Sequence, residues 1–256
     1  MSRIFSHVFR IKKESIFITI SNLIQLVKRS IRGEPTQLVL GYQTFYEHEF
    51  LINENCLIPR WETESLVDLA LAHLSKKKTY KVLDIGSGSG DIGISILMKH
   101  PFLKVVALEK SFFAANISLL NGKKHEVDKR YKVVVCDAIT YLLTNKLKNI
   151  LNGKRYDLLL SNPPYIQCED MKKLVLSVKK FEPKLALYGI GSLGLKFQET
   201  VIMKLVCLLQ PTKKFLMEAD ILQIVFFRRN SRIREGRGNI FFDLVKNPRI
   251  IEVTVG

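Results

Sequence analysis

The 256-residue sequence predicts an α/β domain built on a mostly parallel, doubly wound sheet. From Tyr80 onward, short apolar runs alternate with helical patterns, which is typical of a parallel sheet covered by helices on both faces. The last two apolar runs, Ile240–Val245 and Arg249–Val255, are separated by only three residues. That spacing favours a hairpin, so we expect a seven-stranded sheet that finishes with an antiparallel edge.

Five strands are expected before the hairpin, each from a short apolar run: Tyr80–Ile85, Lys104–Glu109, Lys132–Cys136, Tyr156–Ser161 and Lys214–Ala219. Helical patterns lie between these runs or follow them, at Asp91–Lys99, Ser111–Asn121, Glu169–Lys180, Gly194–Leu209 and after Asp220. We assign residues 80–256 to this domain and residues 32–79 to a region that precedes it.

Residues 1–31 form a basic, amphipathic segment. Within the first 33 residues, seven Lys or Arg side chains are opposed by a single acidic one, Glu14, and apolar residues recur at helical intervals from Ile11 to Ile31. This composition is typical of a mitochondrial presequence. The alternative is a short N-terminal helical segment that stays on the protein, and both can be true of successive halves. We therefore expect the mitochondrial matrix as the location, with the cytoplasm as the alternative.

Composition excludes several classes of protein. A hydrophobic content of 47% with 25% charged residues is typical of a folded protein. The four cysteines and five histidines are scattered without ligand spacing, so we expect no disulfide framework and no metal site. The apolar run Ser15–Val27 is too short and polar for a membrane span. The net charge of +16 indicates an acidic partner or a targeting signal.

The first predicted strand runs into the sequence LDIGSGSG, in which Gly86, Gly88 and Gly90 permit a tight turn and close backbone approach. Similar glycine patterns occur in dinucleotide sites and in turns that bind nothing. A pyrophosphate favours a helix N-terminus free of negative charge. Because Asp84 and Asp91 flank these glycines, a cationic or neutral ligand is the better match.

Carboxylates also end the next two strands. Glu109 lies at the interval at which a carboxylate receives ribose hydroxyls in dinucleotide-type sites, and Asp137 could accept from the exocyclic amine of adenine. Each carboxylate alone could be a helix cap, but together they suit adenine, ribose and a positive centre. We therefore expect S-adenosyl-L-methionine as the cofactor, with these candidate ligands: Asp84, Gly86, Gly88, Gly90, Glu109, Asp137 and, beside them, Asn162.

The fourth strand ends in SNPPY, where Pro163 and Pro164 fix the backbone and remove two donors. The Asn162 side-chain oxygen and the Pro163 carbonyl can accept both hydrogens of a planar NH₂ group, and Tyr165 can stack on the substrate. Holding both N–H bonds frees the nitrogen lone pair for attack, so catalysis would be positioning without a strong base. The alternative is a proline-rich turn capped by asparagine.

This combination resembles amino-methyltransferases, which include adenine methyltransferases of DNA and RNA and protein glutamine methyltransferases. Three further stretches narrow the resemblance: RGEP at Arg32–Pro35 with GYQTFY after it, LIPRWETESLVDLAL at Leu57–Leu71, and FEPKLAL at Phe181–Leu187. Together they resemble the release-factor glutamine methyltransferases of the PrmC/HemK family, from Arg32 to the C-terminus. The tryptophan in PRWETE resembles the residue at this position in the eukaryotic organelle branch of that family.

The resemblance implies a Rossmann-like class I methyltransferase that uses S-adenosylmethionine. Its implied substrate is the glutamine side-chain amide in the Gly-Gly-Gln loop of a class I peptide-chain release factor. It also implies that the three glycines bind the methionine side of the cofactor, that Glu109 binds ribose and that Asp137 lies near adenine. Substrate contacts are implied for Asn162, Pro163, Pro164, Tyr165 and, from the segment that lies over the cleft, Pro59, Arg60, Thr63 and Glu64.

Two departures from the family stand out. Bacterial members carry a helical substrate-docking domain ahead of RGEP, whereas only 31 residues precede it here. The basic run Arg228–Arg237 is either a solvated face or a weak contact with RNA or the ribosome. Two alternatives to the implied function are an adenine-amine methyltransferase acting on RNA or DNA, and a catalytically idle protein bound to RNA or the ribosome.

Overall fold

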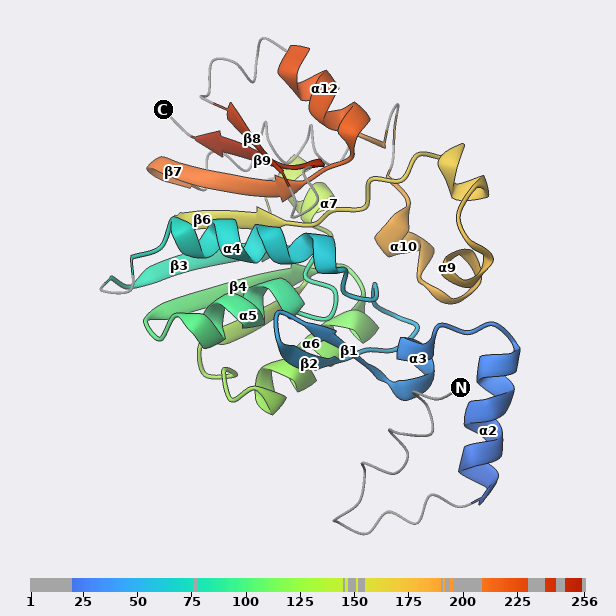
Figure 1. Ribbon diagram of the computed structural model, residues 1–256. Coiled ribbons are helices and arrows are strands. Elements are labelled where there is room, and N and C mark those ends of the chain that lie inside the picture. The colour runs from blue at the N-terminus through green and yellow to red at the C-terminus, as the bar shows by residue number, and fades with distance from the viewer. Residues whose placement is uncertain are drawn as a thin grey trace.

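The computed structural model describes residues 20–75, 78–144, 146, 151, 155–189, 191, 194–195, 209–229, 238–242 and 247–254. A seven-stranded sheet in the order β5-β4-β3-β6-β7-β9-β8 forms its centre (Figure 1). The strands are β3 (Tyr80–Ile85), β4 (Leu103–Glu109), β5 (Tyr131–Val135), β6 (Tyr156–Ser161), β7 (Leu209–Glu218), β8 (Gly238–Phe242) and β9 (Pro248–Thr254). The predicted fold class is confirmed.

Strand directions also follow the prediction. Strands β5, β4, β3, β6 and β7 are parallel, whereas β9 pairs antiparallel with both β7 and β8. Because the parallel strands run the same way, their carboxyl ends meet at one edge of the sheet, which is the right-hand edge in Figure 1. Candidate residues from four strands are thereby brought to a single edge.

Helices cover both faces of the sheet (Figure 1). On one face, α4 (Glu64–Ala72) and α5 (Asp91–Lys99) bury Leu66 and Ile94 against β3 and β6. On the other, α7 (Ala138–Leu143) and α12 (Ile221–Arg229) contribute Leu142 and Ile224 to a second core. Helix α6 (Phe112–Lys124) packs beside β5. This two-sided burial explains why the strands are apolar throughout.

Two predicted helices differ from the structure. In place of one helix at Glu169–Lys180 there are a 3₁₀ turn η2 (Asp170–Lys172), α9 (Leu176–Phe181) and, beyond it, α10 (Lys184–Leu187). Helix α9 buries no residue, so no apolar stripe favours a longer helix, and Val175 before it is extended with ψ at 139°. Of the predicted helix Gly194–Leu209, Leu209 belongs to β7, and residues 196–208 lie outside the described ranges.

Helix α7 is not among the predicted helices. It has six residues, too few for a periodic pattern to be recognised, and the side chain of Asp137 caps it by accepting from the Thr140 N–H at 3.2 Å. The cap places Asp137 at the start of a helix and at the carboxyl end of β5, and its carboxylate therefore has a structural partner before any ligand is considered.

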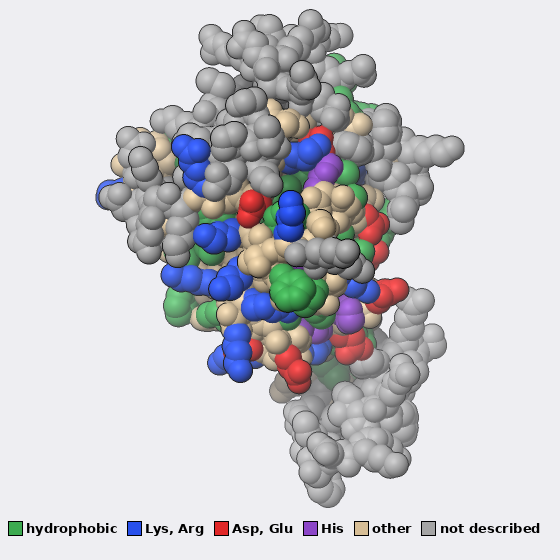
Figure 2. Space-filling model, turned by 90° about the vertical axis from the view of Figure 1, so that its left-hand side faces the viewer, with side chains coloured by type: hydrophobic (Ala, Val, Ile, Leu, Met, Phe, Trp, Pro, Cys, Tyr) green, Lys and Arg blue, Asp and Glu red, His purple; other side chains and the backbone are tan. Residues whose placement is uncertain are grey.

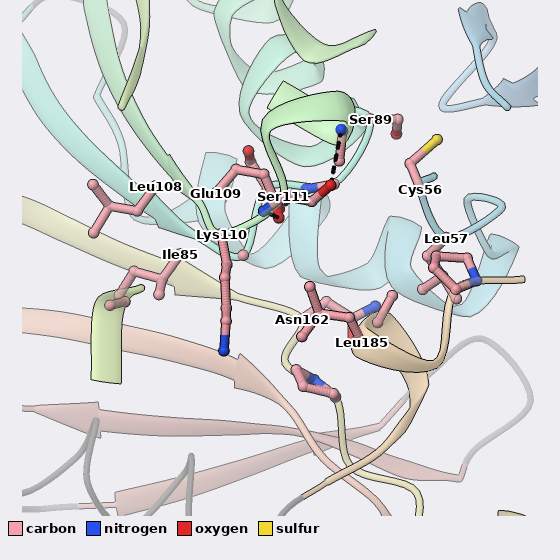
Figure 3. A pocket seen from close by; sticks show the side chains of 18 of the residues that line it. Cys56, Leu57, Ile85, Ser89, Leu108, Glu109, Lys110, Ser111, Asn162 and Leu185 are labelled. Carbon is pink, nitrogen blue, oxygen red and sulfur yellow. Dashed lines mark hydrogen bonds between the residues drawn. The ribbon is translucent and has the colours of Figure 1, made fainter. Parts of the chain in front are cut away.

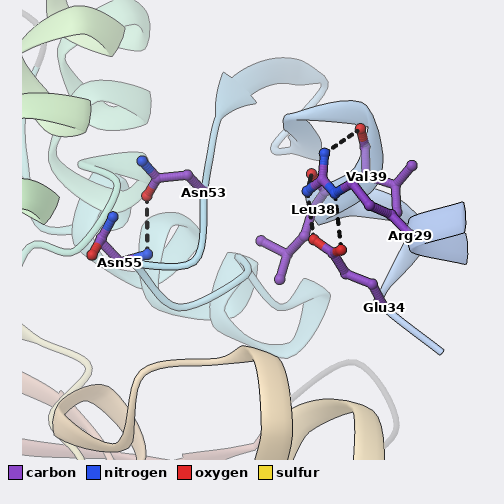
Figure 4. A network of polar contacts seen from close by, with 6 residues as sticks. All are labelled: Arg29, Glu34, Leu38, Val39, Asn53 and Asn55. Atoms are coloured by element: carbon purple, nitrogen blue, oxygen red, sulfur yellow. Dashed lines mark hydrogen bonds and ion pairs between the residues drawn. The ribbon is translucent and has the colours of Figure 1, made fainter. Parts of the chain in front are cut away.

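The segment before β3 packs onto the domain. It contains α2 (Ile20–Ile31), α3 (Thr36–Leu40), the hairpin β1 (Tyr42–Phe45) and β2 (His48–Leu51), and a 3₁₀ turn η1 (Trp61–Thr63) that leads into α4. Figure 4 shows Arg29 of α2 paired with Glu34 and donating to the carbonyl oxygen of Leu38 at 2.9 Å. Phe45 and Phe50 are buried in the same core as α4 and α5. The hairpin is therefore part of the domain's packing.

Candidate functional site

A cavity of about 450 Å³ opens at the carboxyl ends of β3, β4, β5 and β6. Residues predicted from the sequence line much of it: Pro59, Arg60, Thr63, Gly86, Gly88, Glu109, Asp137, Asn162 and Pro164. Figure 3 shows Glu109, Lys110 and Ser111 at one side and Asn162 beside Leu185 at another. Five predicted residues do not line the cavity: Asp84, Gly90, Pro163, Tyr165 and Glu64.

The glycine turn separates the three glycines by role. Gly86 and Gly88 have φ values of +75° and +55°, and a Cβ atom on either would meet nothing within 4 Å. Gly90 also has a positive φ, but a Cβ there would lie 2.6 Å from Ser118 Oγ and 2.8 Å from Tyr131 Oη. The first two glycines therefore expose backbone to the cavity, whereas Gly90 lets the turn pack against α6 and β5.

Glu109 is held in a fixed orientation at the end of β4. Its carboxylate accepts from the backbone N–H of Gly88 at 2.9 Å and from that of Ser111 at 2.7 Å, and the residue is almost fully buried. These bonds join the glycine turn to the start of α6. A carboxylate held in this way is pre-organised for a ligand, because only unused acceptor positions face the cavity.

Asp137 is partly exposed and forms an ion pair with Lys110, whose Nζ lies 2.9 Å from its Oδ2. Partial burial acts to raise the pKa of this carboxyl, but hydrogen bonds from Lys110 and from the Thr140 N–H outweigh that effect, and the pKa is lowered. Asp137 is therefore ionised at neutral pH and can act only as an acceptor.

Asp91, and not the predicted Asp84, lines the cavity beside the glycine turn. Asp84 is fully buried, and burial together with the charge of Asp91 raises the pKa of its carboxyl to about 8. Asp91 lines the cavity and accepts from Ser89 Oγ at 2.6 Å, while burial raises the pKa of its carboxyl to about 6. An acid at the first position of the helix after the glycine turn is the signal that identifies Asp91 as a site residue.

On the opposite wall, Asn162 is part of a chain of side-chain hydrogen bonds. Its Nδ2 donates to Thr63 Oγ1 at 3.0 Å, and Thr63 Oγ1 donates to Glu218 Oε2 at 2.6 Å. Tyr165 Oη donates to Glu218 Oε1 at 3.2 Å, and burial raises the pKa of this tyrosine. The stacking role predicted for Tyr165 stays a prediction, since its ring lies outside the cavity lining.

The segments PRWETE and FEP, far apart in sequence, meet beside Asn162. Arg60 Nη2 lies 2.6 Å from Glu182 Oε1, and the backbone N–H of Ile58 donates to Glu182 Oε2 at 3.2 Å. The Glu182 side chain is completely buried, while Arg60 remains one third exposed at the cavity wall. Glu64 instead accepts from the Tyr46 N–H at 2.9 Å and so anchors the β1–β2 hairpin.

Sequence reasoning missed several lining residues, namely Asn55, Cys56 and Leu57 before PRWETE and Leu185, Ala186 and Tyr188 after FEP. Their proximity to those two segments was the available signal. Cys56 is buried, and burial raises the pKa of its thiol to about 12, so it contributes a neutral surface.

Within the described ranges, no group of three or more His, Cys, Asp or Glu side chains could hold a metal ion. Among the helices that those ranges include, none has the length and apolar character needed to cross a membrane.

Comparisons with known proteins bear on the domain. Residues 64–181 match the family model of the methyltransferase small domain. The release factor glutamine methyltransferase of Koribacter versatilis is 33% identical over 195 residues, covering 76% of this chain and 65% of that protein. The enzyme of the same name from Staphylococcus aureus is 36% identical over 176 residues, covering 69% of this chain and 59% of that protein. The chain is a relative of the release factor glutamine methyltransferases.

The family resemblance drawn from the motifs is thus confirmed, and the chain spans about three fifths of the length of those two relatives. A solved structure, the N-terminal domain of human METTL16 in complex with SAH, has a TM-score of 0.57 at 17% identity, covering 80% of this chain and 75% of that one. At that identity the likeness concerns the fold, and it supports the class I methyltransferase architecture.

Proposed function

We propose that the protein methylates the side-chain amide nitrogen of the glutamine in the Gly-Gly-Gln loop of a class I peptide-chain release factor. The observation that carries this proposal is the orientation of Asn162, whose NH₂ group is bonded to Thr63 so that its oxygen remains available at the cavity. An available carbonyl oxygen suits an acceptor that brings N–H donors. The release factor as substrate is supported by the names of the two bacterial relatives.

S-adenosylmethionine fits the other half of the cavity. Its volume of about 450 Å³ is in the usual range for small-molecule sites, and Asp91, Glu109 and Asp137 line it. These three carboxylates outnumber the two basic lining residues, Arg60 and Lys110, and this excess favours a ligand with a positive centre. Gly86 and Gly88 would contact the amino-acid part, Glu109 the ribose and Asp137 the adenine amine. When bound, this cofactor supplies a methyl group on a positively charged sulfur atom.

The chain's own residues would act by positioning. Asn162 Oδ1 would accept a hydrogen bond from the substrate amide, which weakens conjugation of its nitrogen lone pair and directs that lone pair toward the methyl group. The Pro163 carbonyl is the predicted second acceptor, and because Pro163 is outside the cavity lining this role stays a prediction. No side chain needs to remove a proton first, because the nitrogen becomes acidic once it carries the extra methyl group.

The proposal is tested with cofactor labelled in its methyl group. The protein is incubated with a release factor, with the same factor carrying Gln→Ala in its Gly-Gly-Gln loop, and with bulk RNA. We expect label on the unmodified release factor alone. Label on RNA would favour the adenine-amine alternative, label that survives the Gln→Ala change would exclude this glutamine, and no label on any substrate would favour the idle protein.

We also propose an accessory contact with RNA or the ribosome through a basic row at the amino-terminal edge of the sheet. Lys81, Lys104 and Lys132 are exposed on the neighbouring strands β3, β4 and β5, and Lys81 is the register partner of Lys104. Figure 2, which faces this edge, shows Lys and Arg side chains gathered on part of it. Like charges opposite each other on neighbouring strands repel. The negative charges of a phosphate backbone would reduce this repulsion between the lysines.

A triple Lys→Gln variant of the basic row should lose most of any RNA affinity and most of its salt dependence, as measured by fluorescence anisotropy. Equal binding by both proteins would exclude this surface. The run Arg228–Arg237 lies mostly outside the described ranges and carries no part of this proposal.

Finally, we propose a mitochondrial location, supported by the basic and acid-poor composition of residues 1–31. A fluorescent fusion of the full chain should reach the matrix. A variant in which the Lys and Arg residues of the first 33 positions are changed to Gln should not. Cytoplasmic fluorescence from the unchanged chain would contradict it.

A further inference from the structure

Glu218 ends β7 directly beneath the acceptor side of the cavity, and no motif singled it out. The residue is 2% exposed, and both carboxylate oxygens are engaged: Oε2 accepts from Thr63 Oγ1 and Oε1 accepts from Tyr165 Oη. A buried carboxylate is costly, and an apolar residue of similar size would fill the same space more favourably. A physical explanation is therefore needed for why a carboxylate bonded to Thr63 and Tyr165 occupies this position.

The hydrogen bonds that link Asn162, Thr63 and Glu218 can run in only one donor-to-acceptor direction. Burial raises the pKa of Glu218, and the hydrogen bond from Thr63, the charge of Arg249 and the hydrogen bond from Tyr165 act against that rise. In its ionised form the carboxylate has acceptors and no donor, so Thr63 donates its single hydroxyl hydrogen to Glu218. The Thr63 oxygen can then only accept, and the group that donates to it is Nδ2 of Asn162 at 3.0 Å. The amide of Asn162 is thereby fixed with its nitrogen toward Thr63 and its oxygen away from it. Donor order, rather than packing, sets this orientation.

The second oxygen of Glu218 restrains the other end of the same loop. It accepts from Tyr165, and the backbone carbonyl of Tyr165 accepts from Gln223 Nε2 at 3.3 Å. Close packing adds to this restraint, because a Cβ on Gly194 would lie 2.7 Å from that carbonyl oxygen. The Asn-Pro-Pro-Tyr loop is therefore held at both ends by one carboxylate, with the two prolines rigid between them.

We propose that Glu218 is the positioning residue of the acceptor site: by accepting from Thr63 and Tyr165, it sets the direction in which Asn162 presents its side-chain oxygen. This inference rests on the proposed function and deepens it. Glu218 does not line the cavity and acts through Thr63 and Tyr165. With a neutral amide in place of the carboxylate, Thr63 could turn its hydroxyl toward Asn162 and allow the amide to flip.

The first test compares variants that keep or remove one donor. Thr63→Ser retains the hydroxyl and should therefore keep more of the kcat than a variant that lacks it. Thr63→Val has nearly the same shape without the hydroxyl, and Glu218→Gln has nearly the same shape without the charge. Each of these two should lower kcat on the release factor by about 100-fold, the cost of a misplaced group, while the Kd for S-adenosylhomocysteine stays unchanged.

Glu252 offers a matched control. It is also a fully buried glutamate in the same sheet, and it pairs with His73 at 2.6 Å and with Lys214, away from the cavity lining. Glu252→Gln should lower the Tm but leave kcat close to that of the unchanged protein. If Glu252→Gln lowers kcat as strongly as Glu218→Gln, or if Glu218→Gln leaves kcat unchanged, the role of Glu218 is structural and the inference is overturned.

A second measurement does not depend on activity. The side-chain NH₂ signals of Asn162 can be assigned in ¹⁵N NMR spectra by their loss in Asn162→Asp. In the unchanged protein one of the two protons should be protected from solvent exchange, and in Glu218→Gln and Thr63→Val the protection should fall by about tenfold or more. Unaltered protection would overturn the inference even if the protein proves to methylate another substrate. Protection lost as expected, in a protein inactive on release factors, would contradict only the proposed function.

Discussion

The two halves of the cavity are assembled in different ways. On the cofactor side, polar contacts lie within one turn or join consecutive strands: Ser89 and Asp91 are two residues apart, and Gly88 and Glu109 are 21 apart. On the acceptor side, Thr63 and Glu218 are 155 residues apart, and Arg60 and Glu182 are 122 apart. The first half forms once consecutive strands have paired, whereas the second exists only when the whole domain has closed.

This difference teaches that binding and transfer can be separated by mutation. Changes on the cofactor side should weaken binding of the cofactor. Changes on the acceptor side should lower transfer while the cofactor still binds, because Gly86 and Gly88 bond to Leu108 and Glu109 of β4 and not to acceptor-side residues.

Asn162→Ala should have the largest effect. It removes the side-chain oxygen proposed to polarise the acceptor amide, and kcat should fall by about 10²–10³-fold, as when one transition-state hydrogen bond is removed from other enzymes. Cofactor affinity, measured by isothermal titration calorimetry, should be nearly unchanged. A collapse of cofactor affinity would show that Asn162 belongs to the cofactor side, and the comparison of the two halves would break.

Asp84→Asn tests the buried carboxyl group behind the cofactor side of the cavity. Burial and the charge of Asp91 raise the pKa of this carboxyl from 3.8 to about 8, so the folded protein binds the proton more tightly than the unfolded chain does. Stability should therefore fall as pH rises through that range. At about pH 8 the free energy of unfolding of the variant should exceed that of the unchanged protein by several kcal/mol, on the order of 5, and at about pH 4 the two should be similar, as measured by urea unfolding. An equal difference at both pH values would exclude this cause.

Glu109→Gln should weaken the cofactor side selectively. Glutamine has only one acceptor oxygen for the N–H groups of Gly88 and Ser111, so one buried donor loses its partner at a cost of about 1–3 kcal/mol. Cofactor Kd should rise by about 10-fold to 100-fold, with kcat at saturating cofactor changed far less. A fall in kcat without a change in Kd would contradict the assignment.

Arg60→Gln should have the smallest effect. The side chain is one third exposed, so its ion pair with Glu182 is screened by solvent, and Glu182 keeps its bond from the Ile58 N–H. The KM for the release factor should rise by about tenfold or less, with cofactor Kd unchanged. Glu49, an exposed residue that pairs loosely with Lys124, supplies a control: Glu49→Gln should alter neither constant. A larger loss of kcat/KM for Arg60→Gln than for Asn162→Ala would contradict the weak role assigned to Arg60.

Local residue patterns were enough to predict the sheet. The bounds of β3 and β6 agree with the prediction, and so do those of α5, because each strand is buried on both faces and each helix between them has a start signal. The same patterns failed at α9, where no buried face exists to favour a longer helix, and at α7, which is too short to show a period.

For the site, the residue pattern alone identified which residues stand at the carboxyl ends of the strands, and parallel strands bring those ends to one edge. That was enough for Gly86, Gly88, Glu109, Asp137 and Asn162, all of which line the cavity. The burial of Asp84 outside the lining, and the link from Glu218 through Thr63 to Asn162, follow only from the folded domain. Hydrogen bonds between residues more than a hundred positions apart leave no periodic trace in a sequence, since their partners meet only after the sheet is complete.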